Sequence, residues 1–203
     1  MQPSIRVDIE RIIREGGRVA LELGCGAKRV KGRITIDKRD LPGVDIIADL
    51  EDGLPFLPDR SVDAIHCRSV LEHIGNFENL IGEIVRVLKD DGTAHIFVPH
   101  FSNPYYYSDY THKRLFGLYS FYYFVDASRQ PSRKVPSFYT DIRVEVVSLK
   151  LKFRSPFLIV RAARKLFGAI VNLHPFLQEF YEGNFCYVVP CDGIEVILRP
   201  ARP

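Results

Sequence analysis

The first hundred residues contain five short apolar runs, and this series restricts the possible folds more than any other feature. The runs cover residues 19–23, 33–37, 44–48, 62–66 and 93–99. The first is nearly continuous in apolar residues, as expected of a strand in a parallel sheet with both faces covered by helices. Because helical segments alternate with the runs, the sequence predicts an α/β fold built on an open, mostly parallel sheet.

Two amphipathic helices are predicted in the same half. The first follows Ser4, a candidate N-cap, and ends at Gly16 and Gly17; its apolar residues at helical spacing are Ile5, Ile9, Ile12 and Ile13. The second lies between Asn76 and Lys89, before the stop at residues 91–92. One face of this second helix carries Phe77, Leu80, Ile81, Ile84, Val85 and Leu88.

The second half of the chain has a different character. Eleven of the 24 residues 101–124 are Phe or Tyr with no regular period, which indicates a cap or loop inserted after the fifth strand. Apolar residues occupy every second position over residues 142–153, with a slip of phase near Val147, and this pattern predicts a long strand with a bulge. A helix is predicted over residues 156–180. Two last strands, over residues 185–189 and 194–198, are expected to complete the sheet as its antiparallel part.

Composition excludes several other classes of protein. The chain has 203 residues, of which 46% are hydrophobic and 26% charged, and this excludes collagen-like, disordered and disulfide-stapled chains. A formal charge of only +3 argues against a nucleic-acid partner. The four cysteines lack CxxC spacing, so we expect no metal and reduced thiols. Without a signal sequence or an apolar stretch of about 18 residues, a cytoplasmic protein is expected, one that at most lies on a membrane.

A glycine-containing turn follows the first strand, in the sequence ELGCGA that begins at Glu22. Glycines at this point let the backbone approach a ligand, which then sits at the N-terminus of the next helix. Asp37 ends the second strand, where a carboxylate can accept both hydroxyls of a ribose. Arg29 replaces the third glycine of a dinucleotide site, and Glu22 would repel a pyrophosphate. The cationic S-adenosylmethionine therefore fits the setting better than a dinucleotide.

Four segments in consecutive order carry a family resemblance: ELGCGA, ITID, ADLEDGLPFLPDRSVDAIHCRSVLEHI and VRVLKDDGTAHIFVPH. Over about residues 17–100 the chain resembles the class I S-adenosylmethionine-dependent methyltransferases of the type-11 family. The resemblance implies a Rossmann-like α/β fold with a seven-stranded, mostly parallel sheet, an antiparallel last strand and helices on both faces. It also implies one domain, residues 1–203, with a cofactor-binding half of about 1–100 and a substrate cap and sheet-completing half of about 101–203.

The resemblance implies the following cofactor-binding residues: Glu22, Gly24, Cys25, Gly26, Asp37, Lys38, Asp49, Leu50 and Arg68. The first four would cradle the amino-acid part of the cofactor, Asp37 would bind the ribose and Lys38 would lie beside the adenine. Asp49, with the leucine after it, would meet the adenine edge, and Arg68 would line the pocket. Asp49 could instead be only a loop acid, and Arg68 only its surface partner. For Glu72 and His73 we favour a structural role at a helix start, where an acid complements the helix dipole.

The acceptor side should carry a group that removes a proton, because an acceptor hydroxyl must lose one during methyl transfer. His100 directly follows the fifth strand, and the segment SDYTHKR brings Asp109 and His112. Histidine suits the role since its ordinary pKa is about 6.5, and the aspartate could fix its tautomer. These three are the candidate catalytic residues. The candidate substrate-binding residues are Tyr105, Tyr106, Tyr110 and Arg114. The alternative is that the histidines are satisfied loop residues and the tyrosines are cap core.

The acceptor itself is not specified by any motif. NPYY at residues 103–106 is similar to the motif of amino-methylating nucleic-acid enzymes, but it lacks the second proline and follows the fifth strand instead of the fourth. We therefore discount base methylation. The segment PHFSNPYYYSDYTHKRLF more nearly resembles methyltransferases encoded with glycan-assembly enzymes. The sequence thus predicts methyl transfer from S-adenosylmethionine to a small-molecule or glycan hydroxyl. The alternative is a non-catalytic cofactor-binding subunit that activates or anchors a partner.

The predicted helix over residues 156–180 is strongly amphipathic. Its polar stripe consists of Arg161, Arg164, Lys165, Gly168 and Asn172. The opposite apolar face contains Leu158, Ile159, Ala162, Leu166, Ile170 and Leu173. A basic amphipathic helix can lie on a membrane surface, but such helices more often pack on their own sheet, and we favour packing. The sequence is also compatible with a homodimer.

Overall fold

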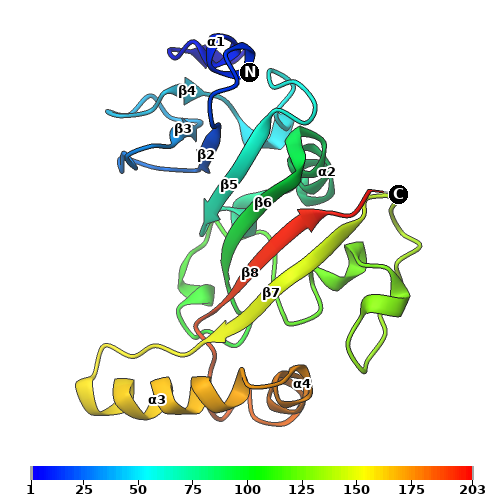
Figure 1. Ribbon diagram of the computed structural model, residues 1–203. Helices are drawn as coiled ribbons and strands as arrows, with labels where there is room; N and C mark the ends of the chain where they lie inside the picture. Colours follow the sequence, from blue (N-terminus) through cyan, green and yellow to red (C-terminus); the bar gives the residue numbers. More distant parts are fainter. Residues whose placement is uncertain (1, 203) are drawn as a thin grey trace.

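The computed structural model describes residues 2–202, which form one mixed sheet with helices (Figure 1). The strand order is β1-β4-β3-β2-β5-β6-β8-β7. Neighbouring strands from β4 to β6 pair in parallel, whereas β1 and β8 pair antiparallel with their neighbours. The strands are β1 (Ser4–Ile5), β2 (Ala20–Leu23), β3 (Ile34–Asp37), β4 (Ile46–Ile47), β5 (Val62–Arg68), β6 (Leu88–Pro99), β7 (Val144–Lys152) and β8 (Gly193–Pro200). The predicted α/β fold class is confirmed, and β1 adds a short strand at one edge.

The order of the strands creates a crevice beside β2. This strand pairs with β3 on one side and β5 on the other, so the chain moves outward in two directions from it. In open α/β sheets, ligands bind at the carboxyl ends of the strands where the strand order reverses in this way. The turn after Leu23, the end of β3 and the end of β5 therefore define where a ligand is expected.

Helix α2 (Phe77–Val87) covers one face of the sheet with the apolar positions that the sequence predicts. It ends at Val87, earlier than predicted, because β6 already begins at Leu88 and contains the expected stop at residues 91–92. Aromatic rings from the segment after β6 complete this layer: Phe116, Phe121 and Phe124 all lie edge-on to Phe77. The predicted bulge is confirmed, since the pairing of β7 with β8 shifts between Val146 and Ser148.

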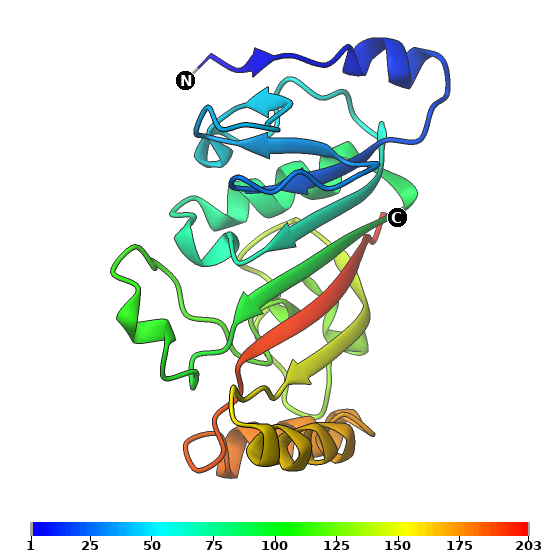
Figure 2. The same cartoon turned by 90° about the vertical axis from the view of Figure 1, so that its left-hand side faces the viewer.

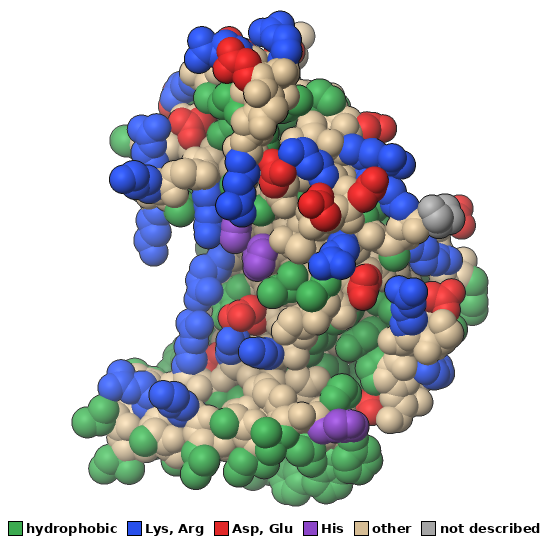
Figure 3. All heavy atoms as spheres, viewed as in Figure 1, with side chains coloured by type: hydrophobic (Ala, Val, Ile, Leu, Met, Phe, Trp, Pro, Cys, Tyr) green, Lys and Arg blue, Asp and Glu red, His purple; other side chains and the backbone are tan. Residues whose placement is uncertain are grey.

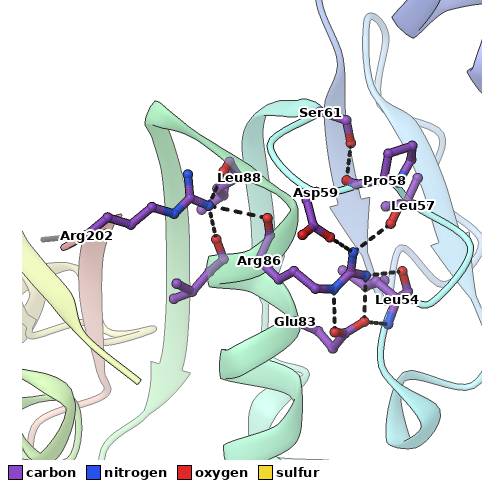
Figure 4. Close-up of polar contacts among 10 residues, drawn as sticks. Leu54, Leu57, Pro58, Asp59, Ser61, Glu83, Arg86, Leu88 and Arg202 are labelled. Carbon is purple, nitrogen blue, oxygen red and sulfur yellow. Dashed lines mark hydrogen bonds and ion pairs between the residues drawn. The ribbon is translucent and has the colours of Figure 1, made fainter. Parts of the chain in front are cut away.

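Two guanidinium groups fix the loops around α2 (Figure 4). Arg86 bonds Glu83 within the helix and donates to the carbonyls of Leu54 and Leu57, which holds the loop before β5. Arg202 donates to the carbonyl of Leu88 at 2.9 Å and so ties the end of the described chain to the start of β6. Each guanidinium satisfies loop or helix-end carbonyls that would otherwise lack donors.

The opposite face of the sheet differs from the expectation of helices on both sides. Among the described residues no helix lies between β2 and β3; residues 24–33 form turns, with Gly24, Gly26 and Gly32 at φ +63°, +56° and +79°. Glycine adopts such angles without steric cost, so the backbone turns here instead of continuing as a helix. Figure 2 views the sheet from this side, with the strands in front of α2. The polar side chains of His66 and His95 lie half-buried on the open face.

The late helical segment also differs from the prediction. It forms two helices, α3 (Leu158–Val171) and α4 (Pro175–Asn184), because Pro175 cannot continue α3 and instead occupies the first turn of α4. The strand predicted over residues 185–189 is wrong: this segment is a series of turns, closed by hydrogen bonds from Val188 and Val189 to the carbonyl of Phe185. The short helix α1 (Ile9–Arg14) begins later than expected because β1 occupies residues 4–5.

The orientation of α3 reverses the packing prediction. Asn172 exchanges hydrogen bonds with both backbone groups of Leu151 on β7, and Gly168 is buried against Phe153, so the C-terminal part of the polar stripe faces the body. Arg161 and Lys165 at its other end are exposed. The apolar face points away: Ile159 is 87% exposed and Leu166 is 65% exposed. Gly168 and Asn172 make this contact together with the apolar side chains of Phe167, which lies edge-on to Phe153, and the buried Val171. The described helices include none long and apolar enough to cross a membrane.

Candidate functional site

A cavity of about 340 Å³ opens at the crevice beside β2. It lies where the carboxyl ends of β2, β3 and β5 meet, as expected for a ligand site in this kind of sheet. Its walls come from four segments of the chain: the turn after β2, the end of β3, the loop before β5, and the region after β5 with part of the later aromatic segment. The lining residues are Gly24, Asp37, Lys38, Arg39, Asp49, Leu50, Glu51, Ser69, Val70, His73, Ile74, Thr111 and Lys113.

Gly24 makes the floor of this cavity possible. Its φ of +63° lies in the left-handed region, and a Cβ atom built there would be 2.3 Å from Cγ2 of Val70. Its N–H donates to the carbonyl of Ile36 at 2.8 Å, which fixes the turn against β3. A side chain at this position would collide with the region after β5 and narrow the cavity, so the site requires glycine.

Asp37 combines a structural and a binding capacity. Its Oδ2 accepts the N–H of Gly26 at 2.8 Å and its Oδ1 accepts the N–H of Arg39 at 3.0 Å. Each carboxylate oxygen can accept a further hydrogen bond, so both remain able to receive a hydroxyl. The carboxylate is thus held in place by the backbone of the glycine turn and lines the cavity, where the sequence predicts a ribose acceptor.

Asp49, Leu50 and Lys38, which the sequence assigns to the adenine, all line the cavity. Asp49 accepts the N–H of Glu51 through Oδ1 at 3.0 Å, which leaves Oδ2 able to accept from a ligand amine. Leu50 is buried and supplies an apolar wall. Together with the space beside Gly24, these groups fit the nucleoside part of S-adenosylmethionine.

Four predicted cofactor residues do not line the cavity. Glu22 pairs with Arg33 at 2.5 Å, and Arg68 stacks over the ring of Phe97 at 4.3 Å. The buried Cys25 donates its thiol to the carbonyl of Gly26. Gly26 itself contributes through the hydrogen bond to Asp37 and not as a wall of the cavity.

The opposite wall carries titratable groups from the segment SDYTHKR, which folds back over the short 3₁₀ helix Leu71–His73. The N–H of Lys113 donates to the carbonyl of Glu72 at 2.7 Å, and the hydroxyl of Thr111 lies 2.9 Å from Nδ1 of His73. The rings of His73 and His112 are 4.8 Å apart between centroids. The structure thus brings the catalytic candidate His112 next to His73, for which the sequence favoured a structural role.

Glu72 is unusual within this wall. Its side chain is only 1% exposed, and among the described residues its Oε2 has no hydrogen-bond partner. Burial raises the pKa of Glu72 to about 7, with a further rise from the charge of Asp109. A buried carboxylate without a partner costs free energy, so this group is a candidate for contact with a ligand.

Glu51 stabilises the same wall through its contacts with Lys113 and with the backbone after the 3₁₀ helix. Burial alone would raise the pKa of this carboxyl, but the Lys113 ammonium at 2.6 Å and the N–H groups of Gly75 and Asn76 outweigh burial and lower it to about 2. Glu51 is therefore ionised at neutral pH and ties the acceptor segment to the region after β5.

His112 does not line the cavity itself but lies against His73, which does, and the other acceptor candidates lie apart from the cavity. His100 is 0% exposed, and its two ring nitrogens contact Ser102 and Glu182. Tyr106 is buried and donates to the carbonyl of Arg114, whose guanidinium caps the carbonyl of Gly75. Tyr105 and Tyr110 are exposed at the surface. Asp109 is exposed and accepts from Thr111, with Oδ2 3.6 Å from Nε2 of His112.

Comparison with known proteins finds a family match for part of the chain. Residues 26–96 match the family described as "Methyltransferase domain". No curated protein sequence matches the chain significantly.

Solved structures extend the likeness to nearly the whole chain. A SAM-dependent methyltransferase from Archaeoglobus fulgidus superposes with a TM-score of 0.52 at 16% identity, covering 94% of this chain and 92% of its own. A protein from Bacillus halodurans assigned as a methyltransferase gives 0.53 at 16% identity, covering 96% and 99%. A Haloferax volcanii methyltransferase in complex with the Trm112 methyltransferase activator gives 0.54 at 13% identity, covering 92% and 83%.

The fold is therefore that of the class I methyltransferases, and the predicted resemblance is confirmed. Within this fold, residues 26–96 are similar to the family described as a methyltransferase domain, and the Archaeoglobus fulgidus protein that shares the fold is a SAM-dependent methyltransferase.

Proposed function

We propose that the chain transfers a methyl group from S-adenosylmethionine to a hydroxyl of a small-molecule or glycan acceptor. The observation that carries this proposal is that one cavity joins Asp37 and Asp49 on one wall to His73 and Thr111 on the other. A nucleoside held by the two carboxylates would have titratable groups from the acceptor segment beside it. Positioning of this kind accounts for much of the acceleration of a two-substrate reaction.

S-adenosylmethionine supplies a methyl group on a cationic sulfur, and the carbon–sulfur bond breaks as the acceptor oxygen bonds the methyl carbon. The residues of this chain then have to receive the hydroxyl proton. His112 is the best placed histidine, because its Nδ1 lies 2.9 Å from the carbonyl of Tyr106 and must donate to it, which leaves Nε2 as the proton acceptor. Asp109, at 3.6 Å from Nε2, stabilises the imidazolium that results. His100 has no nitrogen free for this step.

Calorimetric titration with S-adenosylhomocysteine tests the cofactor site. We expect binding to the wild type and at least a tenfold loss in Asp37→Ala, a loss of about 1.4 kcal/mol. Asp40→Ala is the matched control, because Asp40 pairs with Arg6 on the surface outside the cavity and its removal should leave binding unchanged. Equal binding by Asp37→Ala and the wild type would contradict the ribose role.

Release of S-adenosylhomocysteine in the presence of candidate hydroxyl acceptors tests the activity. We expect His112→Ala to lower turnover about 10²–10⁴-fold, the usual contribution of a positioned proton acceptor, while cofactor binding is retained. The competing hypothesis is a non-catalytic cofactor-binding subunit that activates or anchors a partner protein. It predicts cofactor binding without release for every acceptor offered, and no effect of His112→Ala.

The exposed apolar face of α3 supports a further part of the proposal, contact with a membrane. Beyond α3 the surface continues over α4 and the turn that follows, and Figure 3 shows it as a hydrophobic strip along the lower edge of the molecule. Its large exposed side chains are Phe157, Leu158, Ile159, Leu166, Ile170, Leu173, Phe176, Phe180, Phe185, Tyr187 and Val188. Continuous apolar patches of this kind mark sites of protein or membrane contact.

Charge favours an anionic lipid surface over a protein as the occupant of this strip. Residues 154–178 contain no Asp or Glu, whereas Arg161 and Lys165 border the apolar face of α3. The two acids of α4 point into the body: Glu179 accepts from Tyr119 and Glu182 contacts His100. An apolar helix face bordered by cations is typical of helices that lie in the headgroup region of anionic membranes. The loop after β6, with Pro104 and Tyr105, and the start of α3 line one hollow, so a lipid-linked acceptor held there would lie beside the segment that follows the carboxyl end of β6.

Vesicle sedimentation tests this contact. We expect the protein to bind vesicles that contain phosphatidylglycerol and to bind pure phosphatidylcholine vesicles more weakly. The double variant Ile159→Glu with Leu166→Glu should abolish binding, while Phe138→Glu, which alters an exposed ring outside the strip, should not. Failure of the wild type to bind either vesicle would refute membrane contact. A dimer in solution that the double variant dissociates would assign the strip to a second copy of the chain instead.

A further inference from the structure

Three potential metal ligands meet at the acceptor wall of the cavity. Glu72 and His73 are neighbours in the 3₁₀ helix after β5, and His112 is brought to them by the segment that folds back over this helix. One ligand atom from each of the three side chains lies within 4.8 Å of the other two. Ligands of a tetrahedral ion at about 2.1 Å lie about 3.4 Å apart, so modest side-chain rotation would close the set around a cation.

The hydrogen bonds of the two histidines leave the lone pair of Nε2 in each ring available for a metal ion. Nδ1 of His112 donates to the carbonyl of Tyr106, so its Nε2 carries the lone pair. The hydroxyl of Thr111 donates to Asp109 at 2.6 Å and therefore accepts from Nδ1 of His73, which leaves the lone pair on Nε2 there as well. Histidines that bind metals usually donate their other ring nitrogen to an oxygen in this way, which fixes the tautomer and the ring orientation.

Glu72 supplies the second, independent observation. Its carboxylate is 1% exposed, and its Oε2 is buried with no hydrogen-bond partner among the described residues. A buried acceptor of this kind normally has a partner or lies next to a ligand. A cation between Glu72 and the two imidazoles would provide that partner and offset the cost of burying the charge.

We propose that Glu72, His73 and His112 form a binding site for a divalent transition-metal ion of the Zn²⁺ type. Two imidazoles and one carboxylate suit zinc and its first-row neighbours, whereas Mg²⁺ and Ca²⁺ prefer oxygen ligands alone. Three protein ligands leave a coordination position open, as in catalytic zinc sites. Since His73 also lines the cavity, the open position would be available to an acceptor oxygen. The binding proposal does not depend on methyl transfer.

The site gives His112 two uses that exclude each other. A nitrogen lone pair that binds a cation cannot also accept a proton. In the metal-free protein His112 is therefore the proton acceptor. In the metal-loaded protein the cation would instead bind the acceptor oxygen and lower the pKa of its hydroxyl, as cations do for bound water. This second statement rests on the proposed function, whereas the occupancy of the site can be measured without any acceptor.

Titration of the metal-free full-length chain tests the proposal. After treatment with a chelator, we expect one Zn²⁺ per chain by calorimetry and visible absorption bands when Co²⁺ is used as the probe. His73→Ala, His112→Ala and Glu72→Gln should each weaken binding at least about tenfold. Glu72→Gln also controls for folding, because it keeps the size of the side chain while removing its charge.

The histidine pair on the open sheet face provides the matched control. His66 and His95 are stacked on neighbouring strands with centroids 4.8 Å apart, and neither lines the cavity or belongs to the proposed ligand set, so His66→Ala should bind Zn²⁺ as the wild type does. The proposal would be overturned by absence of stoichiometric binding, by equal binding in all four variants, or by loss in His66→Ala alone. If zinc binds as expected but no acceptor is methylated, the metal site stands and the proposed function fails.

Discussion

Nε2 of the buried His100 lies 2.9 Å from Oε2 of Glu182, which joins the end of β6 to α4 across 82 residues of sequence. The same carboxylate oxygen accepts the N–H of Leu118 at 2.6 Å, and Nδ1 of His100 contacts the hydroxyl of Ser102 at 2.8 Å. The carboxylate of Glu182 therefore connects α4 to the end of β6 and to the aromatic segment that contains Leu118. A histidine held on both sides in this way orders the fold.

Removal of this carboxylate should destabilise the protein. Glu182→Ala leaves a buried imidazole and a backbone N–H without their acceptor, and we expect the free energy of unfolding to fall by about 2–4 kcal/mol. Urea denaturation measures the change, with the exposed Glu15→Ala as the control. A loss below about 0.5 kcal/mol, the size of an ordinary surface effect, would show that the contact is not structural.

A methyl group at Gly24 should block the cofactor cavity. In Gly24→Ala the new Cβ would collide with Val70 at 2.3 Å, so we expect S-adenosylhomocysteine binding to be lost. Adding Val70→Ala should restore part of the affinity, because the collision is removed while the strain of a positive φ, about 1 kcal/mol, remains. Gly183→Ala is the control, since a Cβ there meets no atom within 4 Å. Unchanged binding in Gly24→Ala would contradict the position of the ligand.

The free energy of unfolding should decrease as the pH is lowered, because of a histidine on the open face of the sheet. Burial, followed by the charge of Arg33, lowers the pKa of His66 to about 4, whereas in the unfolded chain it is about 6.5. Between these values the unfolded state binds a proton that the folded state does not, so the free energy of unfolding decreases as the pH drops from about 6.5 to 4. Urea denaturation across this range should show a shallower dependence in His66→Asn. Identical pH dependence in the two proteins would contradict the assignment.

Asn172 supplies the main polar contact between α3 and β7. Asn172 accepts from the N–H of Leu151 at 2.8 Å and donates to its carbonyl at 2.8 Å, and it also accepts from Gln178. Asn172→Ala leaves these partners unsatisfied, and we expect a loss of about 2–3 kcal/mol in the free energy of unfolding. Asn184→Ala, which removes one exposed contact within α4, is the control. Equal stability of the two variants would contradict the packing of α3 by its polar stripe.

The sequence predicts the centre of the fold well because local signals there agree with tertiary ones. The strands β2, β3, β5 and β6 are largely apolar runs bounded by turns, and such runs are typical of a parallel sheet. Gly24, Asp37 and Asp49 meet in the cavity because parallel strands bring their carboxyl ends together. This part of the site follows from strand order alone.

The remaining features depend on contacts that no local pattern encodes. The amphipathic pattern of α3 defines two faces but does not say which one meets the body, and the decision depends on Leu151 and Phe153 of a different element. The pairing of Thr111 with His73 spans 38 residues, so the LEHI segment carries no sign that it faces the acceptor segment. A buried carboxylate cannot be distinguished from a helix-start acid until its surroundings are known. The absence of a helix after Gly26 could have been suspected from the third glycine, Gly32, within the same loop.

The most direct test of the account is a crystal structure of the protein soaked with S-adenosylhomocysteine. We expect the nucleoside to occupy the cavity between Asp37 and Asp49, with both ribose hydroxyls on the Asp37 carboxylate and the sulfur directed toward the wall formed by His73 and Thr111. Density for the compound at any other place, or a cavity that stays closed by side chains while the compound is present, would contradict the central claim.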